Sequence, residues 1–281
     1  MLPLKPFFCL GALALSLLSP ITASANERIV SAGSAVTELM VALGVDDQLV
    51  AVDVTSTLPG NTTLPKIGYH RRLSAEGLLA LSPTLLIGSD EMGPGSTLEQ
   101  LKSAGVRVEI VNTQASTAGL LARVDQIAAL THSETRAETL KKDLQQQLDA
   151  LTHQPLNTPK KVLFLLIHEG RAANVAGKDT TPDAIIRLAG GINPAARQLT
   201  SYKPLSMESM VEMQPDVILV SGRSYDKLGG ADALLKAMPM LAATPAGQNK
   251  QILTIDGHAL VGGLGLKSLA EAERLHQLLS K

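Results

Sequence analysis

Residues 68–72 read Gly-Tyr-His-Arg-Arg and place a tyrosine beside a histidine and two arginines. Aromatic residues are scarce in this chain, which has three tyrosines, no tryptophan and, beyond residue 10, only Phe164 as phenylalanine. A nearby cation favours the phenolate form of a tyrosine, and arginine stays charged at physiological pH. A phenolate is a hard anionic ligand for ferric iron. A solvated basic turn in which Tyr69 packs on its neighbours explains the same pattern, so the motif alone leaves both interpretations open.

An internal repeat predicts where these residues lie in the fold. Residues 73–88 and 205–222 align without a gap from their first Leu-Ser pair into an apolar run, at an offset of 132 positions. In each copy a serine caps a short helix, a proline follows the helix, and the apolar run forms a buried strand. A helix–strand unit used twice indicates two related lobes.

The rest of the chain alternates short apolar runs with helical segments, which predicts two α/β lobes with mainly parallel sheets and a ligand cleft between them. The further predicted strands span residues 28–31, 49–53, 106–111, 161–167 and 251–255. A helical stripe of Ala137, Leu140, Leu144, Leu148 and Leu151 predicts one long, stiff connecting helix of about 20 residues. We divide the chain into residues 1–25, a signal peptide; 26–115, the N-terminal lobe; 116–157, including the connecting helix; and 158–281, the C-terminal lobe.

Ligands of open parallel sheets collect beyond the carboxyl ends of the strands, so the segments at those ends hold the candidate binding residues. All three tyrosines fall on loops that we place there. One such tyrosine has a simple explanation, because tyrosine is amphipathic and suits a loop edge. Met207 and Met210 would line the cleft or belong to the core. The strand-end candidates are Tyr69, Glu91, His168, Arg171, Tyr202, Lys203, Arg223, Tyr225 and His258.

The first 25 residues carry Lys5, an apolar run and Ala23-Ser24-Ala25, a pattern that predicts export to the periplasm and cleavage after Ala25. A lipoprotein acylated at Cys9 fits less well, because this cysteine precedes the apolar run. The mature chain then has no cysteine, which excludes disulfides and thiolate metal sites. Its 24 basic and 26 acidic residues give no reason to expect nucleic acid as a partner.

Four stretches carry a resemblance to a known family: residues 28–53, 64–88, 101–111 and 163–193. The mature chain resembles the periplasmic haem-binding proteins of bacterial haem ABC importers, relatives of cobalamin- and siderophore-binding proteins. The resemblance implies two α/β lobes bridged by one long helix, in agreement with the repeat. Its specific part is the glycine-tyrosine-x-arginine loop, which makes Tyr69 the axial iron ligand and Arg71 the group that holds it as phenolate.

The resemblance also assigns roles to other residues. Arg72 and Arg223 become candidates for pairing with the haem propionates, and Lys203 is a weaker one. Some members of the family use a tyrosine from one lobe and a histidine from the other, on one haem or on two stacked haems. His168 is the matching histidine, whereas His70 and His258 are weaker candidates and the role of His70 stays unassigned.

We therefore expect a monomeric periplasmic protein that captures one or two haems for iron uptake and delivers them to an inner-membrane permease with its ATPase. An outer-membrane haem receptor would act upstream, and Glu91, Glu99 and Asp232 are candidate docking residues. The alternative ligands are a ferric siderophore or cobalamin, although those relatives usually bring tryptophans to the cleft. No nucleotide-binding or hydrolase motif supports an enzyme, and residues 262–268 (GGLGLKS) read as a turn into the last helix.

Overall fold

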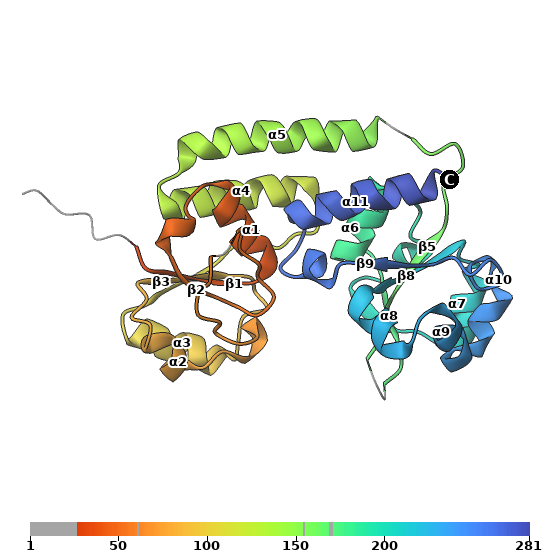
Figure 1. Cartoon of the computed structure of the whole chain (residues 1–281), viewed down its shortest axis with the longest axis horizontal. Helices are drawn as coiled ribbons and strands as arrows, with labels where there is room; N and C mark the ends of the chain where they lie inside the picture. Colours follow the sequence, from red (N-terminus) through yellow and green to blue (C-terminus); the bar gives the residue numbers. More distant parts are fainter. Residues whose placement is uncertain (1–26, 61, 154, 169–170) are drawn as a thin grey trace, which may run out of the picture.

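The computed structural model describes residues 27–60, 62–153, 155–168 and 171–281. The predicted signal peptide and its cleavage site lie outside these ranges. The described chain forms two α/β lobes, each with its own sheet, as predicted (Figure 1). No helix in the described part of the chain combines the length and the apolar character of a membrane span.

The N-terminal lobe contains a four-stranded parallel sheet in the order β2-β1-β3-β4. Its strands are β1 (Ile29–Ala32), β2 (Leu49–Val52), β3 (Leu85–Gly88) and β4 (Arg107–Ile110). Its helices are α1 (Ser34–Ala42), η1 (Asp46–Gln48), η2 (His70–Arg72), α2 (Ala75–Leu79), α3 (Gly95–Ser103) and α4 (Thr117–Thr131), where η denotes a 3₁₀ helix. Figure 1 shows α1 and α4 over one face of the sheet and α2 and α3 over the other. Strands β1 and β3 are buried on both faces, which explains their mostly apolar sequences, whereas the edge strand β4 is partly exposed.

The C-terminal lobe contains a five-stranded sheet in the order β7-β6-β5-β8-β9. Its strands are β5 (Val162–Leu166), β6 (Asn174–Ala176), β7 (Tyr202–Pro204), β8 (Val217–Ser221) and β9 (Ile252–Ile255). Its helices are α6 (Thr181–Leu188), η3 (Pro194–Arg197), α7 (Met207–Glu212), α8 (Gly222–Leu228), α9 (Ala231–Ala237), η4 (Pro239–Ala243), α10 (Pro245–Gln248), η5 (Gly257–Leu260) and α11 (Leu266–Leu279). The antiparallel pairs β5-β6 and β6-β7 were missed from the sequence, because three residues are too few to show a pattern.

The repeat corresponds to equivalent structure in the two lobes. Ser74 and Ser206 cap α2 and α7 by accepting a hydrogen bond from the backbone N–H three residues on, at 3.3 and 3.2 Å. Each helix leads into a central strand, β3 or β8. The residues before the two prolines, Ser82 and Gln214, both adopt a left-handed backbone with φ of 47° and 45°. The helix–strand unit predicted from the sequence is therefore confirmed. Both copies also share a strained backbone position, which the sequence did not predict.

The connecting helix is α5 (Glu134–Thr152), and it lies over both lobes in Figure 1. Ala137, Leu144 and Leu148 of the predicted stripe are buried, and Leu140 and Leu151 pack against the same core. One hydrophobic cluster runs from the α1 and α4 side of the first sheet to the α6 and α11 side of the second. The two lobes thus share a continuous core beneath the connecting helix.

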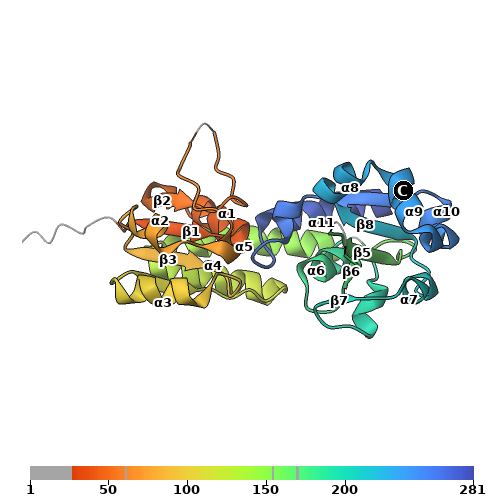
Figure 2. The same ribbon diagram turned by 90° about the horizontal axis from the view of Figure 1, so that it is seen from below.

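A second connection between the lobes was not predicted. Residues 261–267, here called the interlobe loop, follow β9 and η5 and contact the N-terminal lobe. Leu264 O accepts a hydrogen bond of 2.8 Å from Arg123, and Lys267 N–H donates one of 3.2 Å to Glu38. Figure 2 shows α11 beginning beside the N-terminal lobe and running into the other one. The predicted turn is present, and it also joins the two lobes.

Candidate functional site

The loop that carries Tyr69 lies at the carboxyl ends of the first sheet. Gly68 has φ of +81°, a conformation that favours glycine, and its carbonyl accepts a 3.0 Å hydrogen bond from Val54, just after β2. Tyr69 then caps η2, and its carbonyl accepts a 2.7 Å hydrogen bond from Arg72 N–H. The Tyr69 side chain is 41% exposed. The backbone is thus fixed on both sides of an accessible phenol.

His70 is the buried member of this loop, with no accessible surface. Its Nδ1 lies 2.9 Å from Asp53 Oδ2, and its Nε2 lies 3.5 Å from Glu91 Oε2. The second distance is an ion-pair contact and is long for a hydrogen bond. Glu91 also pairs with the Arg71 guanidinium. We call these four residues, Asp53, His70, Glu91 and Arg71, the His70 cluster.

The pKa values in the cluster favour the charged forms. Burial alone would lower the pKa of His70, but its interactions with Asp53 and Glu91 outweigh burial and raise it. Burial would raise the pKa of Asp53, but hydrogen bonds from His70, Ser56 and Thr55 bring it below its ordinary value. The interaction with His70 lowers the pKa of Glu91 despite burial, and the charge of Arg71 adds to this effect. These shifts favour an alternation of negative and positive charge along Asp53, His70, Glu91 and Arg71.

Tyr202 belongs to the C-terminal lobe and is affected by the charges of this cluster. Its ring packs edge-on against Phe164, with 6.5 Å between ring centroids. Burial raises the pKa of the Tyr202 phenol; the negative charge of Glu91 raises it further, and the charge of Arg71 opposes this. Glu91 and Arg71 belong to the other lobe, so the electrostatic influence of the His70 cluster reaches Tyr202 across the lobe junction. The sequence predicted Tyr202 on a loop, but Tyr202 is the first residue of strand β7. Its raised pKa favours the neutral phenol.

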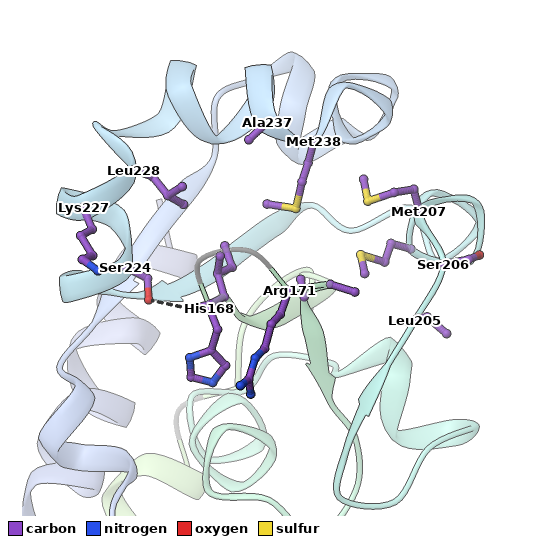
Figure 3. Close-up of a pocket in the computed structure, with 14 residues that line it drawn as sticks. His168, Arg171, Leu205, Ser206, Met207, Ser224, Lys227, Leu228, Ala237 and Met238 are labelled. Atoms are coloured by element: carbon purple, nitrogen blue, oxygen red, sulfur yellow. Dashed lines mark hydrogen bonds between the residues drawn. The ribbon is translucent and has the colours of Figure 1, made fainter.

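The C-terminal lobe holds a pocket of about 720 Å³ at the end of β5. Ile167, Ala173, Leu205 and Leu228 give it a largely apolar lining, to which Met207, Met210 and Met238 contribute thioethers. Figure 3 shows His168 and Arg171 pointing in the same direction, away from Met207 and Met238. Ser224 Oγ donates a hydrogen bond of 3.3 Å to Ile167 O, which ties α8 to the end of β5. The pocket therefore combines an apolar interior with a polar end.

The other predicted site residues lie apart from the His70 cluster or have different partners. Arg223 and Tyr225 were placed on a loop, but they lie on helix α8, where Tyr225 packs against the second core of its lobe. His258 Nδ1 lies 3.0 Å from Asp256 Oδ1. Arg72, Lys203 and Arg223 have exposed side chains. The partner of Arg71 among the described residues is Glu91, and the predicted effect of Arg71 on Tyr69 stays a prediction.

Asp53 was not recognised from the sequence as a member of this site, although it directly follows β2 and the strand-end rule could have found it. Glu91, three residues after β3, was placed at the strand ends, but its pairing with His70 and Arg71 was not predicted. Glu91 was predicted to dock a permease, and a role in docking stays a prediction. Its contacts with His70 and Arg71 make it a member of the His70 cluster.

Comparisons with known proteins agree with this architecture. The chain is similar to the solved periplasmic haem-binding protein HutB of Vibrio cholerae, with 66% identity, a TM-score of 0.87, and coverage of 92% of this chain and 100% of that one. It is also similar to the periplasmic haem-binding protein BhuT in complex with two haems, with 35% identity, a TM-score of 0.81, and coverage of 90% and 98%. A vitamin B12-binding protein of Vibrio cholerae serotype O1 is 30% identical over 200 residues, which are 69% of this chain and 70% of the relative. The family model for periplasmic binding proteins matches residues 29–259, and the chain therefore belongs to this family of non-enzymatic binding proteins.

Proposed function

We propose that this protein captures haem in the periplasm and delivers it to an inner-membrane ABC importer, with Tyr69 as the axial ligand of the iron. The observation that carries the proposal is the accessible Tyr69 phenol next to the paired charges of the His70 cluster, of which Asp53 and His70 are buried. The 66% identity to a periplasmic haem-binding protein over 92% of the chain supports haem as the cargo. Arg71 would hold Tyr69 as phenolate when iron is bound.

The composition of the site also favours a ligand that brings its own metal ligands. The described residues contain no group of three or more His, Cys, Asp or Glu side chains suited to hold a metal ion. Haem supplies four equatorial nitrogens, so one protein ligand is enough to hold its iron, and tyrosine is a known axial ligand. A bare iron ion at Tyr69 would lack most of its coordination shell.

The C-terminal pocket supports the binding of a large apolar ring. Its volume of about 720 Å³ falls in the range of small-molecule sites, and its interior is lined by aliphatic and methionine side chains. Arg72 and Arg223 are exposed and would pair with the haem propionates, with Lys203 as a weaker partner. Tyr202, Tyr225 and His258 would contribute further contacts to the bound haem.

His168 is the proposed second iron ligand, and it lies on the polar end of the C-terminal pocket. Two arrangements are open to it: Tyr69 and His168 bind the same iron, or each binds the iron of its own haem. The BhuT structure in complex with two haems supports the second arrangement. A hemin titration of the wild type and a His168→Ala variant separates them, since only the second arrangement predicts a fall from two haems to one.

The test of the main proposal is a hemin titration monitored by absorption. We expect a shifted Soret band and a charge-transfer band typical of high-spin ferric phenolate. Tyr69→Phe removes only the hydroxyl, so it should abolish the charge-transfer band and weaken hemin binding by more than about 100-fold. A Tyr69→Phe variant with the wild-type spectrum would refute Tyr69 as the ligand.

A second candidate cargo is cobalamin, because vitamin B12-binding proteins are among the relatives. The absence of tryptophan from the chain disfavours cobalamin and ferric siderophores alike. Calorimetric titration with hemin, cyanocobalamin and a ferric hydroxamate compares the three directly. Binding of cyanocobalamin at least as tight as that of hemin would overturn the haem proposal.

The remaining parts of the proposal concern processing and partners. Signal peptidase would cut after Ala25, which intact mass of the exported protein can measure. The mature protein would be a monomer that receives haem downstream of an outer-membrane receptor. Glu99 and Asp232 are exposed residues paired with Lys102 and Lys250, at 2.9 Å in each case, and are available to dock the permease. Charge reversal at each should weaken transport without changing hemin affinity.

A further inference from the structure

His70 differs from the residues on either side of it. Tyr69, Arg71 and Arg72 have exposed side chains, whereas His70 is fully buried and directs both ring nitrogens at carboxylates. Because the ring is fully buried between these two carboxylates, neither nitrogen is open to an iron in the cleft. His70 is thus unsuited to be an iron ligand, and its contacts point to a different role.

The two carboxylates come from loops that are not neighbours in the sheet. Asp53 follows β2 and Glu91 follows β3, and β1 lies between these strands in the order β2-β1-β3-β4. His70 therefore connects two strand-end loops across the end of β1. Its carbonyl also accepts a 3.0 Å hydrogen bond from Gly93 N–H, just beyond Glu91. The side chain and the backbone of His70 together attach residues 68–72, here called the tyrosine loop, to the sheet.

Tyr69 rests on this anchored ring. The centroids of the Tyr69 and His70 rings lie 4.4 Å apart, with an angle of 56° between their planes. A ring contact this close restricts the two side-chain torsions of tyrosine to orientations that clear the imidazole. The direction in which the Tyr69 hydroxyl leaves the loop is therefore coupled to the position of His70.

Arg71 is coupled to His70 by a different route. Glu91 accepts the Arg71 guanidinium on Oε1 and faces His70 Nε2 with Oε2. Removing His70 would free one side of Glu91 and allow the carboxylate, and Arg71 with it, to move. The predicted partner of the phenolate is thus fixed through the same imidazole.

We infer that His70 is a positioning residue for Tyr69 and Arg71. It does not bind the ligand itself; held by Asp53 and Glu91, it sets the orientation of the Tyr69 side chain and the position of the Arg71 guanidinium. This inference rests on the proposed role of Tyr69 as iron ligand. Residues that orient metal ligands typically change metal affinity by about 10- to 100-fold when they are replaced. We expect an effect of that size on hemin affinity at His70.

Three substitutions test the inference by removing one contact at a time. His70→Asn places an amide near the position of Nδ1 and keeps a partner for Asp53, while His70→Gln reaches toward Glu91 and leaves Asp53. Glu91→Gln keeps the size of a half-exposed side chain and removes the charge that pairs with Arg71. His276→Asn is the matched control, because the Nδ1 of His276 makes a hydrogen bond of 3.1 Å to Ala189 O, distant in the fold from the tyrosine loop.

The measurements are hemin affinity, the position of the ferric-phenolate charge-transfer band, and the rhombicity of the high-spin electron paramagnetic resonance signal. We expect about tenfold or greater loss of affinity and a shifted band in His70→Asn, His70→Gln and Glu91→Gln, and no change in His276→Asn. A change in fold alone would lower the melting temperature without shifting the band of the molecules that remain folded. If the His70 variants do not fold, Glu91→Gln carries the test.

The outcomes separate this inference from the ligand assignment. If Tyr69→Phe loses the band while the three variants keep wild-type affinity and band position, the positioning role is wrong and the ligand assignment stands. If Tyr69→Phe keeps the band, the ligand assignment fails, and the positioning role fails with it. Loss in Tyr69→Phe together with shifted bands in the three variants supports both.

Discussion

Glu38 provides a sharp test of the contacts between the lobes. It lies on α1 and accepts the hydrogen bond from Lys267 N–H at the start of α11. Burial raises the pKa of Glu38 from 4.5 to about 7, although the backbone N–H groups of Lys267 and Leu266 and the charges of Lys267 and Arg123 oppose the rise. The folded protein therefore binds a proton at Glu38 more tightly than the unfolded chain does.

This difference makes stability depend on pH with a definite sign. The contribution of Glu38 to stability is fully present below pH 4.5 and is lost as the pH rises through about 7. Each pKa unit corresponds to about 1.4 kcal/mol. Between pH 5.5 and 8.0 the shift to about 7 removes about 2 kcal/mol of the free energy of unfolding.

Glu38→Gln removes the titration and keeps an oxygen that accepts the N–H of Lys267. We expect the fall in the free energy of unfolding from pH 5.5 to 8.0 to be smaller in this variant by about 2 kcal/mol, measured by urea denaturation. Glu138→Gln, on the exposed side of α5 and paired with Lys141 at 2.8 Å, is the control and should parallel the wild type. Parallel curves for wild type and Glu38→Gln would refute the argument.

Three further predictions concern the fold. Ser82→Gly and Gln214→Gly should each raise the free energy of unfolding in urea by about 0.5–1 kcal/mol, because both residues hold a left-handed backbone; a loss at both sites would show that neither is strained. Gly263→Ala should lower the free energy of unfolding by about 1–3 kcal/mol, since Gly263 has φ of +90° and an added Cβ would collide with Arg123; an unchanged melting temperature would contradict this. Phe164→Ala removes a fully buried ring and should cost about 3–5 kcal/mol in calorimetry, with a smaller loss in Phe164→Leu; equal losses in the two variants would disagree with the packing argument.

The sequence was most informative where structure is local. The strands of residues 85–88 and 217–221 were predictable because each is a continuous apolar run after a capped helix. The connecting helix was predictable from the spacing of its five apolar residues. Strand β6, with the residues Asn-Val-Ala, has no such signal, because it depends on the neighbouring strands for its pairing.

The site shows the same limit. The repeat and the strand-end rule predicted that Tyr69 lies at the edge of the sheet. They did not predict that His70 is buried, because its partner Asp53 is 17 positions earlier and Glu91 follows a different strand. Local patterns cannot reveal which distant carboxylates share a histidine. That information arises only when the strand order β2-β1-β3 brings the loops together.

The interlobe loop and α5 cross between the lobes at two separate places, on different segments of the chain. The lobes also share one core beneath α5, so a change in their relative orientation would have to disturb that core as well as the contacts of Leu264 with Arg123 and of Lys267 with Glu38. We therefore expect the loop of Tyr69 and the pocket beside His168 to keep nearly the same relative placement with and without hemin, which small-angle scattering of the two forms can measure.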